Sequence, residues 1–156
     1  MKRRGLLWLL LASTAAAGAE IPADLAPALD CAGTLEFISL NPVPWPGGPT
    51  TPLLAGYPVL GRVKLRGREE REVLEALRKS MQEPSPPPQQ CFLPRHALVW
   101  DWEKHVYLVL ICLQCQRMTW TRDFDFQAWR PQFPVSSSAR EVFLAVHHRH
   151  GVPLAP

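Results

Sequence analysis

Two long runs of β-forming residues, separated by only two polar residues, constrain the fold of this chain most. Residues 96–102 and 105–120 are rich in Val, Leu, Ile, Trp and Tyr, and a Glu-Lys pair at 103–104 lies between them. Apolar runs so close together in sequence predict an antiparallel hairpin. With the turn at 103–104, His96 faces Ile111. Since side chains alternate between the two faces of a strand, His96 is expected to share the apolar face of Ile111 and to be partly buried.

Regular structure is also predicted before and after the hairpin. The apolar and β-branched residues at 35–40 and 57–65 are typical of strands, with Gly61 as a bulge or a point of close approach. Apolar residues at spacings of three and four predict helices at 68–82 and 137–150. These elements favour an α+β fold with an antiparallel sheet around the central hairpin and both helices packed on one sheet face.

Proline divides the chain further. The segments 41–53 and 84–90 contain several prolines and are expected to be loops, because proline fixes φ and lacks a backbone donor. Residues 123–129 are mixed and aromatic and predict a short strand. We expect one domain over residues 20–156, a length that suits a single core of modest size.

The first 19 residues have the pattern of a secretory signal peptide. Basic residues at 2–4 precede an apolar run at 6–17, and small residues stand just before Glu20. The apolar run is about a dozen residues long, whereas a membrane-spanning helix needs roughly 20. We therefore expect cleavage before Glu20 and a secreted or periplasmic protein that is not held in a membrane.

Removal of this segment changes the charge balance. The whole chain has 17 Lys and Arg against 14 Asp and Glu. The predicted signal contains three of the basic residues and no acidic one, so 14 of each sign remain. A chain of balanced charge has no general basic surface, and nucleic acid is not an expected partner.

The cysteines offer several kinds of chemistry. An exported chain can form disulfides, so the disulfide candidates are Cys31, Cys91, Cys112 and Cys115. Sequence alone does not choose the pairing of four cysteines. The preferred bridge joins Cys91 to Cys112 or Cys115, with Cys31 as the partner of whichever is left.

A metal site and a redox pair are the alternatives. Cys91, His96, Cys112 and Cys115 form a Cys3His set, which suits tetrahedral zinc. Strand geometry argues against this set, because two cysteines three residues apart on a strand point to opposite faces. A redox-active Cys-x-x-Cys normally stands at the start of a helix, whereas here it lies in a β-forming run.

This stretch resembles small exported bacterial proteins of unassigned function. Those proteins carry Cys-x-x-Pro-Arg-His, a hairpin and then Ile-Cys-x-x-Cys, which here are Cys91, Pro94, Arg95, His96, Ile111, Cys112 and Cys115. They are also similar at the end, where a helix runs into Gly-Val-Pro-Leu-Ala, here residues 151–155. This chain departs from the pattern at Ala97 and Leu113, where Gly and Phe are expected. The resemblance implies that the three cysteines belong together with Arg95 and His96, and it implies no activity.

The binding candidates are Arg95, His96, Trp100 and Trp102. His96 is either a core residue with satisfied nitrogens beside a charge-paired Arg95, or a group that tunes or shares a metal with a nearby sulfur. Trp100 and Trp102 are either a ligand platform or aromatic residues packed across the hairpin. His147, His148 and His150 are interpreted as solvent-exposed residues at the end of a helix, where the helix dipole favours positive charge.

Two classes of function follow from these patterns. The first is an exported, disulfide-stabilised small binding or structural module of unknown ligand and with no cofactor. The second is a thiol or zinc-binding protein that uses the Cys3His set. An enzyme is not favoured, because no nucleophile and base can be named as a pair.

Overall fold

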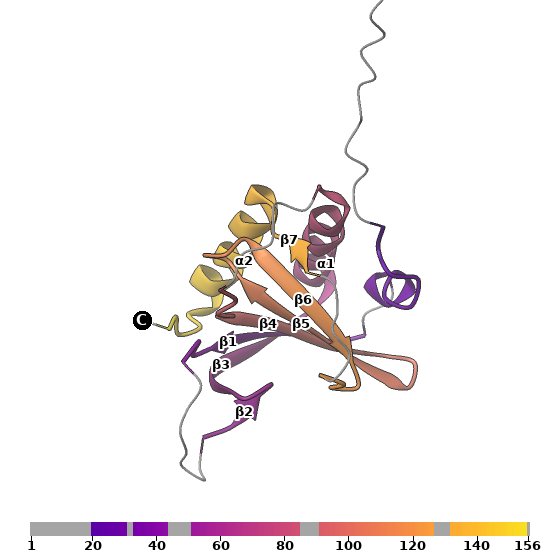
Figure 1. Ribbon diagram of the computed structural model, residues 1–156. Coiled ribbons are helices and arrows are strands. Elements are labelled where there is room, and N and C mark those ends of the chain that lie inside the picture. The colour runs from indigo at the N-terminus through magenta and orange to yellow at the C-terminus, as the bar shows by residue number, and fades with distance from the viewer. Residues whose placement is uncertain (1–19, 31–32, 44–50, 85–90, 127–131, 156) are drawn as a thin grey trace, which may run out of the picture.

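The structure is a computed structural model that describes residues 20–30, 33–43, 51–84, 91–126 and 132–155 (Figure 1). These residues form an open seven-stranded antiparallel sheet and two α-helices that pack together on it. The predicted α+β class and the packing of the helices are confirmed. The predicted signal peptide at 1–19 lies outside the described residues.

The sheet has the strand order β2-β3-β1-β4-β5-β6-β7, so the predicted hairpin contributes its central strands. The strands are β1 Leu35–Leu40, β2 Leu53–Leu54, β3 Tyr57–Leu65, β4 His96–Trp102, β5 His105–Cys112, β6 Arg117–Arg122 and β7 Phe133–Pro134. The helices are η1 Pro27–Leu29, a short 3-10 helix, and the α-helices α1 Gly67–Gln82 and α2 Ser137–His150.

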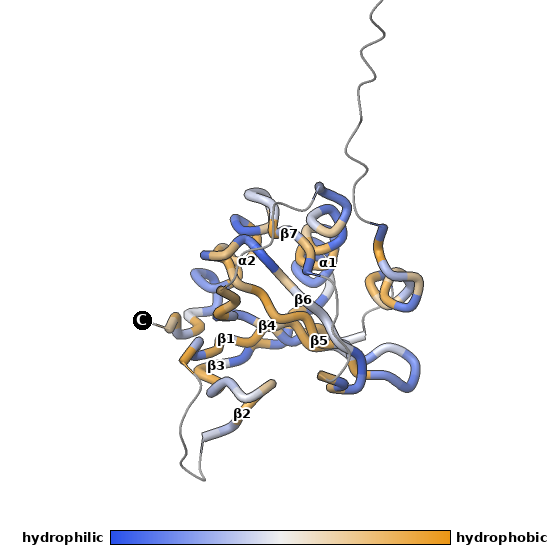
Figure 2. The backbone as a smooth tube through the Cα atoms, viewed as in Figure 1, coloured by the Kyte–Doolittle hydropathy of each residue, from blue (hydrophilic) through white to orange (hydrophobic). Residues whose placement is uncertain are grey.

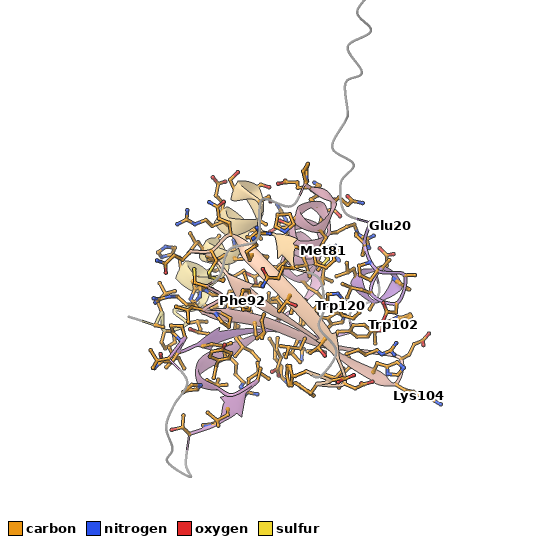
Figure 3. All side chains as sticks on the ribbon, in the orientation of Figure 1. Glu20, Met81, Phe92, Trp102, Lys104 and Trp120 are labelled. Atoms are coloured by element: carbon orange, nitrogen blue, oxygen red, sulfur yellow. A yellow bond between two sulfur atoms is a disulfide. The ribbon has the colours of Figure 1, made fainter. Side chains whose placement is uncertain are left out.

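The β4–β5 hairpin has the predicted register. His96 pairs with Ile111 and Trp102 pairs with His105, and Lys104 lies at the tip (Figure 3). The prediction of one continuous arm over 105–120 is wrong. The chain reverses after Cys112, with Gln116 in the left-handed region at φ 52°, and returns as β6. β4, β5 and β6 are therefore three consecutive antiparallel strands.

The edges of the sheet differ from the prediction. β2 lies at the end of the segment expected to be a loop, and β7 contains a proline; each has only two residues. Both are too short and too irregular in composition to give a periodic sequence signal. No strand forms over the described part of 123–129, where Asp123 and Phe124 both have positive φ. The remainder of that segment, and most of the two proline-rich segments, lie outside the described residues.

The core lies between the sheet and the helices, and Figure 2 shows the apolar strands that face it. An aromatic stack is its largest component. Trp100 stacks on Tyr107 with ring centroids 5.6 Å apart, and Tyr107 stacks on Trp120 at 6.4 Å. The indole N–H of Trp100 donates to Ala28 O at 2.9 Å, which ties η1 to the sheet. The aromatic residues thus pack across the strands, as one of the two interpretations predicted.

Single residues define the two ends of α2. The side chain of Ser136 caps α2 by accepting a hydrogen bond from the N–H of Ala139 at 3.1 Å. Gly151 ends α2 in the left-handed conformation, with φ 60°, where glycine has no steric penalty. The chain then turns back toward the sheet.

We predict that Trp100→Ala will lower the free energy of unfolding by about 3–5 kcal/mol, because it removes a fully buried aromatic side chain. Trp102→Ala, at a partly exposed position of the same strand, should cost clearly less. Urea denaturation followed by circular dichroism measures both. Equal losses in the two variants would show that the stack at Trp100 does not hold the core.

Candidate functional site

Two buried histidines from distant parts of the sequence meet on the helix-covered face of the sheet. His96 begins β4 and His147 lies in the last turn of α2, and each is only 2% exposed. Their ring centroids are 4.5 Å apart and the rings are nearly perpendicular. Phe37 of β1 packs against both rings, at 5.6 Å and 5.1 Å. We call His96 and His147 the imidazole pair.

The hydrogen bonding of the imidazole pair is incomplete. Within the described part of the chain, neither nitrogen of His96 has a hydrogen-bond partner, and Nε2 of His147 has none. Nδ1 of His147 donates to Val152 O at 3.1 Å, since a carbonyl oxygen can only accept. His96 was expected either to be a satisfied core residue or to act beside a sulfur. It is a core residue, but its nitrogens are not satisfied.

Burial keeps both imidazoles neutral at pH 7. The pKa of His96 is lowered to about 3, mainly by loss of solvation and in addition by the neighbouring His147 and Arg95. Burial also lowers the pKa of His147, with a smaller opposing effect from the Val152 carbonyl and a further lowering by His148. The pair is therefore a neutral polar cluster inside an apolar environment.

The C-terminal tail, residues 152–155, lies beside this cluster and is held through its carbonyl groups. Besides the bond from His147 to Val152, the hydroxyl of Ser39 donates to Pro153 O. Arg95 Nη1 donates to Ala155 O at 2.8 Å. The three donors come from β1, from the residue just before β4 and from α2, so the tail joins the two layers of the domain at one end (Figure 1).

Gly61 allows this close approach. Ser39 pairs with Gly61 whereas Leu40 pairs with Val59, so β3 has a bulge at this point. A Cβ atom on Gly61 would lie 2.8 Å from Pro153 Cδ, closer than such contacts normally occur. The sequence analysis proposed a bulge or a close approach at Gly61, and the structure shows both.

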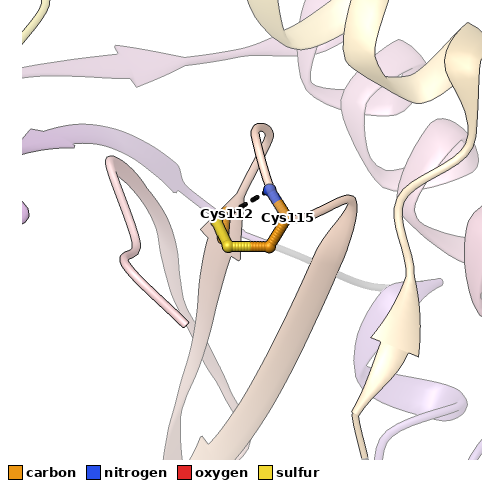
Figure 4. The surroundings of a disulfide bond; sticks show 2 residues. All are labelled: Cys112 and Cys115. Carbon is orange, nitrogen blue, oxygen red and sulfur yellow. Dashed lines mark hydrogen bonds between the residues drawn. A yellow bond between two sulfur atoms is a disulfide. The ribbon is translucent and has the colours of Figure 1, made fainter. Parts of the chain in front are cut away.

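The disulfide differs from the one that was preferred. Cys112 at the end of β5 is bonded to Cys115 in the turn that follows, with an S–S distance of 2.01 Å (Figure 4). The backbone N–H of Cys115 also donates to Cys112 Sγ at 3.0 Å. The argument that these residues point to opposite faces fails because the chain leaves the strand at Cys112. Cys91 is exposed and free, and Cys31 lies outside the described residues.

The Cys3His set is not assembled as a metal centre. In the disulfide, Cys112 and Cys115 cannot supply thiolate ligands. No group of three or more His, Cys, Asp or Glu side chains that could hold a metal occurs among the residues described by the structure. The imidazole pair alone would provide only two of the four ligands that zinc normally takes.

His147 was not predicted from the sequence to be buried. It was interpreted as an exposed residue of the final turn, but His147 follows Phe143 by four residues and so lies on the buried face of α2. The neighbouring Arg149 and His150 do lie outside, where both pair with Glu69 of α1. The spacing from Phe143 was the signal that could have identified His147.

The other binding candidates have different positions. Arg95 belongs to the tail contact just described. Trp100 is 1% exposed within the aromatic stack, and Trp102 is partly buried at its margin, in contact with Tyr107. The two tryptophans therefore do not form an open platform for a ligand.

Comparison with known proteins gives no family for the chain. No protein-family model matches it, and neither the curated proteins nor the solved structures contain a significant match. Within the described residues, no helix is both long enough and apolar enough to cross a membrane. The candidate site is thus defined by its own geometry.

The lowered pKa of His96 predicts a pH dependence of stability. The unfolded chain takes up a proton near pH 6.5, whereas the folded chain with its tail closed takes it up only near pH 3. This contribution to stability is therefore fully present above pH 6.5 and is lost as the pH falls toward 3. The expected loss from this residue is about 3–5 kcal/mol. Chemical denaturation at several pH values should show it, and His96→Leu should remove it. A pH dependence that is the same in both proteins would contradict the assignment.

The close contact of Gly61 gives a second prediction. Gly61→Val should lower the free energy of unfolding by about 1–3 kcal/mol, because the new side chain overlaps Pro153. Gly33→Ala is the matched control, since a Cβ there meets nothing within 4 Å. Thermal unfolding measures both changes, and a melting temperature of Gly61→Val equal to that of the control would rule out the packed tail.

Proposed function

We propose that this chain is an exported, disulfide-stabilised small module that serves in binding or in a structural role, without chemistry of its own. The observation that carries the proposal is the Cys112–Cys115 disulfide. It closes the β5–β6 turn, and its two cysteines are 1% and 5% exposed.

Burial favours a structural role for this bond. Thiol–disulfide exchange requires a thiolate to reach one of the two sulfurs, and shielded sulfurs react slowly. Redox-active Cys-x-x-Cys pairs also gain their reactivity at a helix start, whereas this pair spans a turn between strands. The bond therefore serves best as a fixed link at the turn.

Export is supported by two independent features. The sequence begins with the pattern of a signal peptide, and disulfides persist mainly in oxidising compartments. The second argument is the weaker one, because a single disulfide can also form elsewhere. The ligand of such a module is not identified by its fold.

One contact favours the alternative, a thiol protein. The N–H of Cys115 points at Cys112 Sγ, and a backbone donor stabilises a thiolate. If the bond is reduced, Cys112 is the sulfur that would carry the negative charge. Zinc binding by the reduced cysteines would belong to this alternative.

Alkylation of the native protein separates the two proposals. The protein is isolated without reductant, treated with iodoacetamide and analysed by peptide mass spectrometry. We expect label on exposed Cys91 and none on Cys112 or Cys115. After denaturation and reduction, both of these cysteines should become labelled.

Reduction of the folded protein provides the control. Dithiothreitol without denaturant should reduce the buried bond much more slowly than dithiothreitol with denaturant. Label on Cys112 or Cys115 without any reductant, or equally fast reduction in the two conditions, would favour the thiol protein.

A further inference from the structure

The imidazole pair has an unusual environment for two ionisable groups. Both rings are buried, three of their four nitrogens have no hydrogen-bond partner among the described residues, and the fourth holds the C-terminal tail. A protonated imidazole has two N–H donors and needs two acceptors. Protonation of this pair in the closed structure would therefore bury new donors without partners.

The charges around the pair increase this cost. Arg95, just before β4, disfavours a positive charge on His96, and His148 of α2 disfavours one on His147. β1 contributes the uncharged Phe37, and the tail contributes carbonyl groups. No carboxylate appears among the described groups whose charge acts on either ring. Two imidazolium ions with centroids 4.5 Å apart would also repel each other.

The tail is the part of this environment that can move most easily. Pro153 and Leu154 are exposed, the latter by 53%, and the hydrogen bonds to the tail come from side chains rather than from a neighbouring strand. Gly151 precedes it in a conformation that permits a hinge. Segments with few buried apolar contacts open at a lower free energy than the core does.

We propose that the imidazole pair acts as an acid-sensitive latch for the C-terminal tail. At neutral pH the uncharged pair lies under the tail, and His147 holds Val152. In acid the tail lifts from β1 and β4, water reaches both rings, and their protonation keeps the tail open while the sheet stays folded.

Proton linkage predicts how steeply the opening of the tail should depend on pH. A histidine that binds a proton only in the open form raises the opening equilibrium constant about tenfold per pH unit, once the pH is below its ordinary value near 6.5. Two such histidines raise it by up to about 100-fold per pH unit. The steepness with which the opening equilibrium constant depends on pH therefore gives the number of histidines that are protonated only when the tail is open.

Amide hydrogen exchange measures the opening directly. The N–H of Val152 donates to His147 O at 3.3 Å and is released when the tail lifts. After correction for the intrinsic pH dependence of exchange, we expect its protection to fall by up to about 60-fold between pH 6 and pH 5. Protected amides of β5 should exchange more slowly than Val152 throughout, which shows that the core remains folded.

Three variants test the origin of the slope. His96→Leu should reduce it to about tenfold per pH unit, because one titrating group remains. His147→Gln should reduce the slope by the same amount, and its side-chain amide can still donate to Val152 O. This variant replaces His96→Leu if His96→Leu does not fold. His105→Gln is the control, since His105 is solvent-exposed, pairs with Asp123 and lies far along the hairpin; its slope should equal that of the wild type.

Several results would overturn the latch. These are a Val152 protection that is constant from pH 7 to pH 4, a loss of protection in step with β5, or an unchanged slope in both His96→Leu and His147→Gln. The outcome of the exchange experiment does not depend on the proposed function, because hydrogen exchange is measured at the tail whereas alkylation is measured at the cysteines.

Discussion

The pairing of β4 with β5 is the interaction on which the rest of the structure depends. Its register, from His96 with Ile111 to Trp102 with His105, decides which side chains face the helices. A slip by one residue would turn Trp100, Tyr107 and His96 to the opposite face. The aromatic stack would then lose its place in the core, and the imidazole pair could not form. β1 adds to β4 on one side and β6 adds to β5 on the other, so both inherit this register.

The sequence predicts well those features that follow from local pattern. The two apolar runs around Glu103 and Lys104 determine the hairpin and its register, and helical spacing places both helices within one residue of their observed bounds. Features that depend on contacts between distant segments were not predictable in this way. The meeting of His96 with His147 requires knowledge of how α2 lies on the sheet, and no local pattern contains that information. The turn at 113–116 was missed because it contains none of the Gly, Pro, Asn or Asp residues that usually mark a turn.

The two unusual features of the domain have different roles in the polypeptide. The disulfide links two residues that are already close in sequence, so it fixes one local turn and changes little in the rest of the fold. The tail contact brings residues 152–155 to Ser39 and Arg95, which are remote in sequence, and closes the domain at its end. The tail is held by side chains of these remote residues and not by a neighbouring strand, so it can be released while the sheet stays intact.

The short outer strands of the sheet also affect how copies of the protein meet. β2 and β7 each offer only two residues for pairing, and β7 ends in a proline that cannot donate a hydrogen bond. Next to β2, the exposed Arg62 and Lys64 of β3 pair with Glu36 of β1. Charged side chains and short, proline-containing edges hinder the addition of a foreign strand. A domain whose positive and negative charges balance has little mutual repulsion to keep copies apart, so its edges must provide the resistance to aggregation.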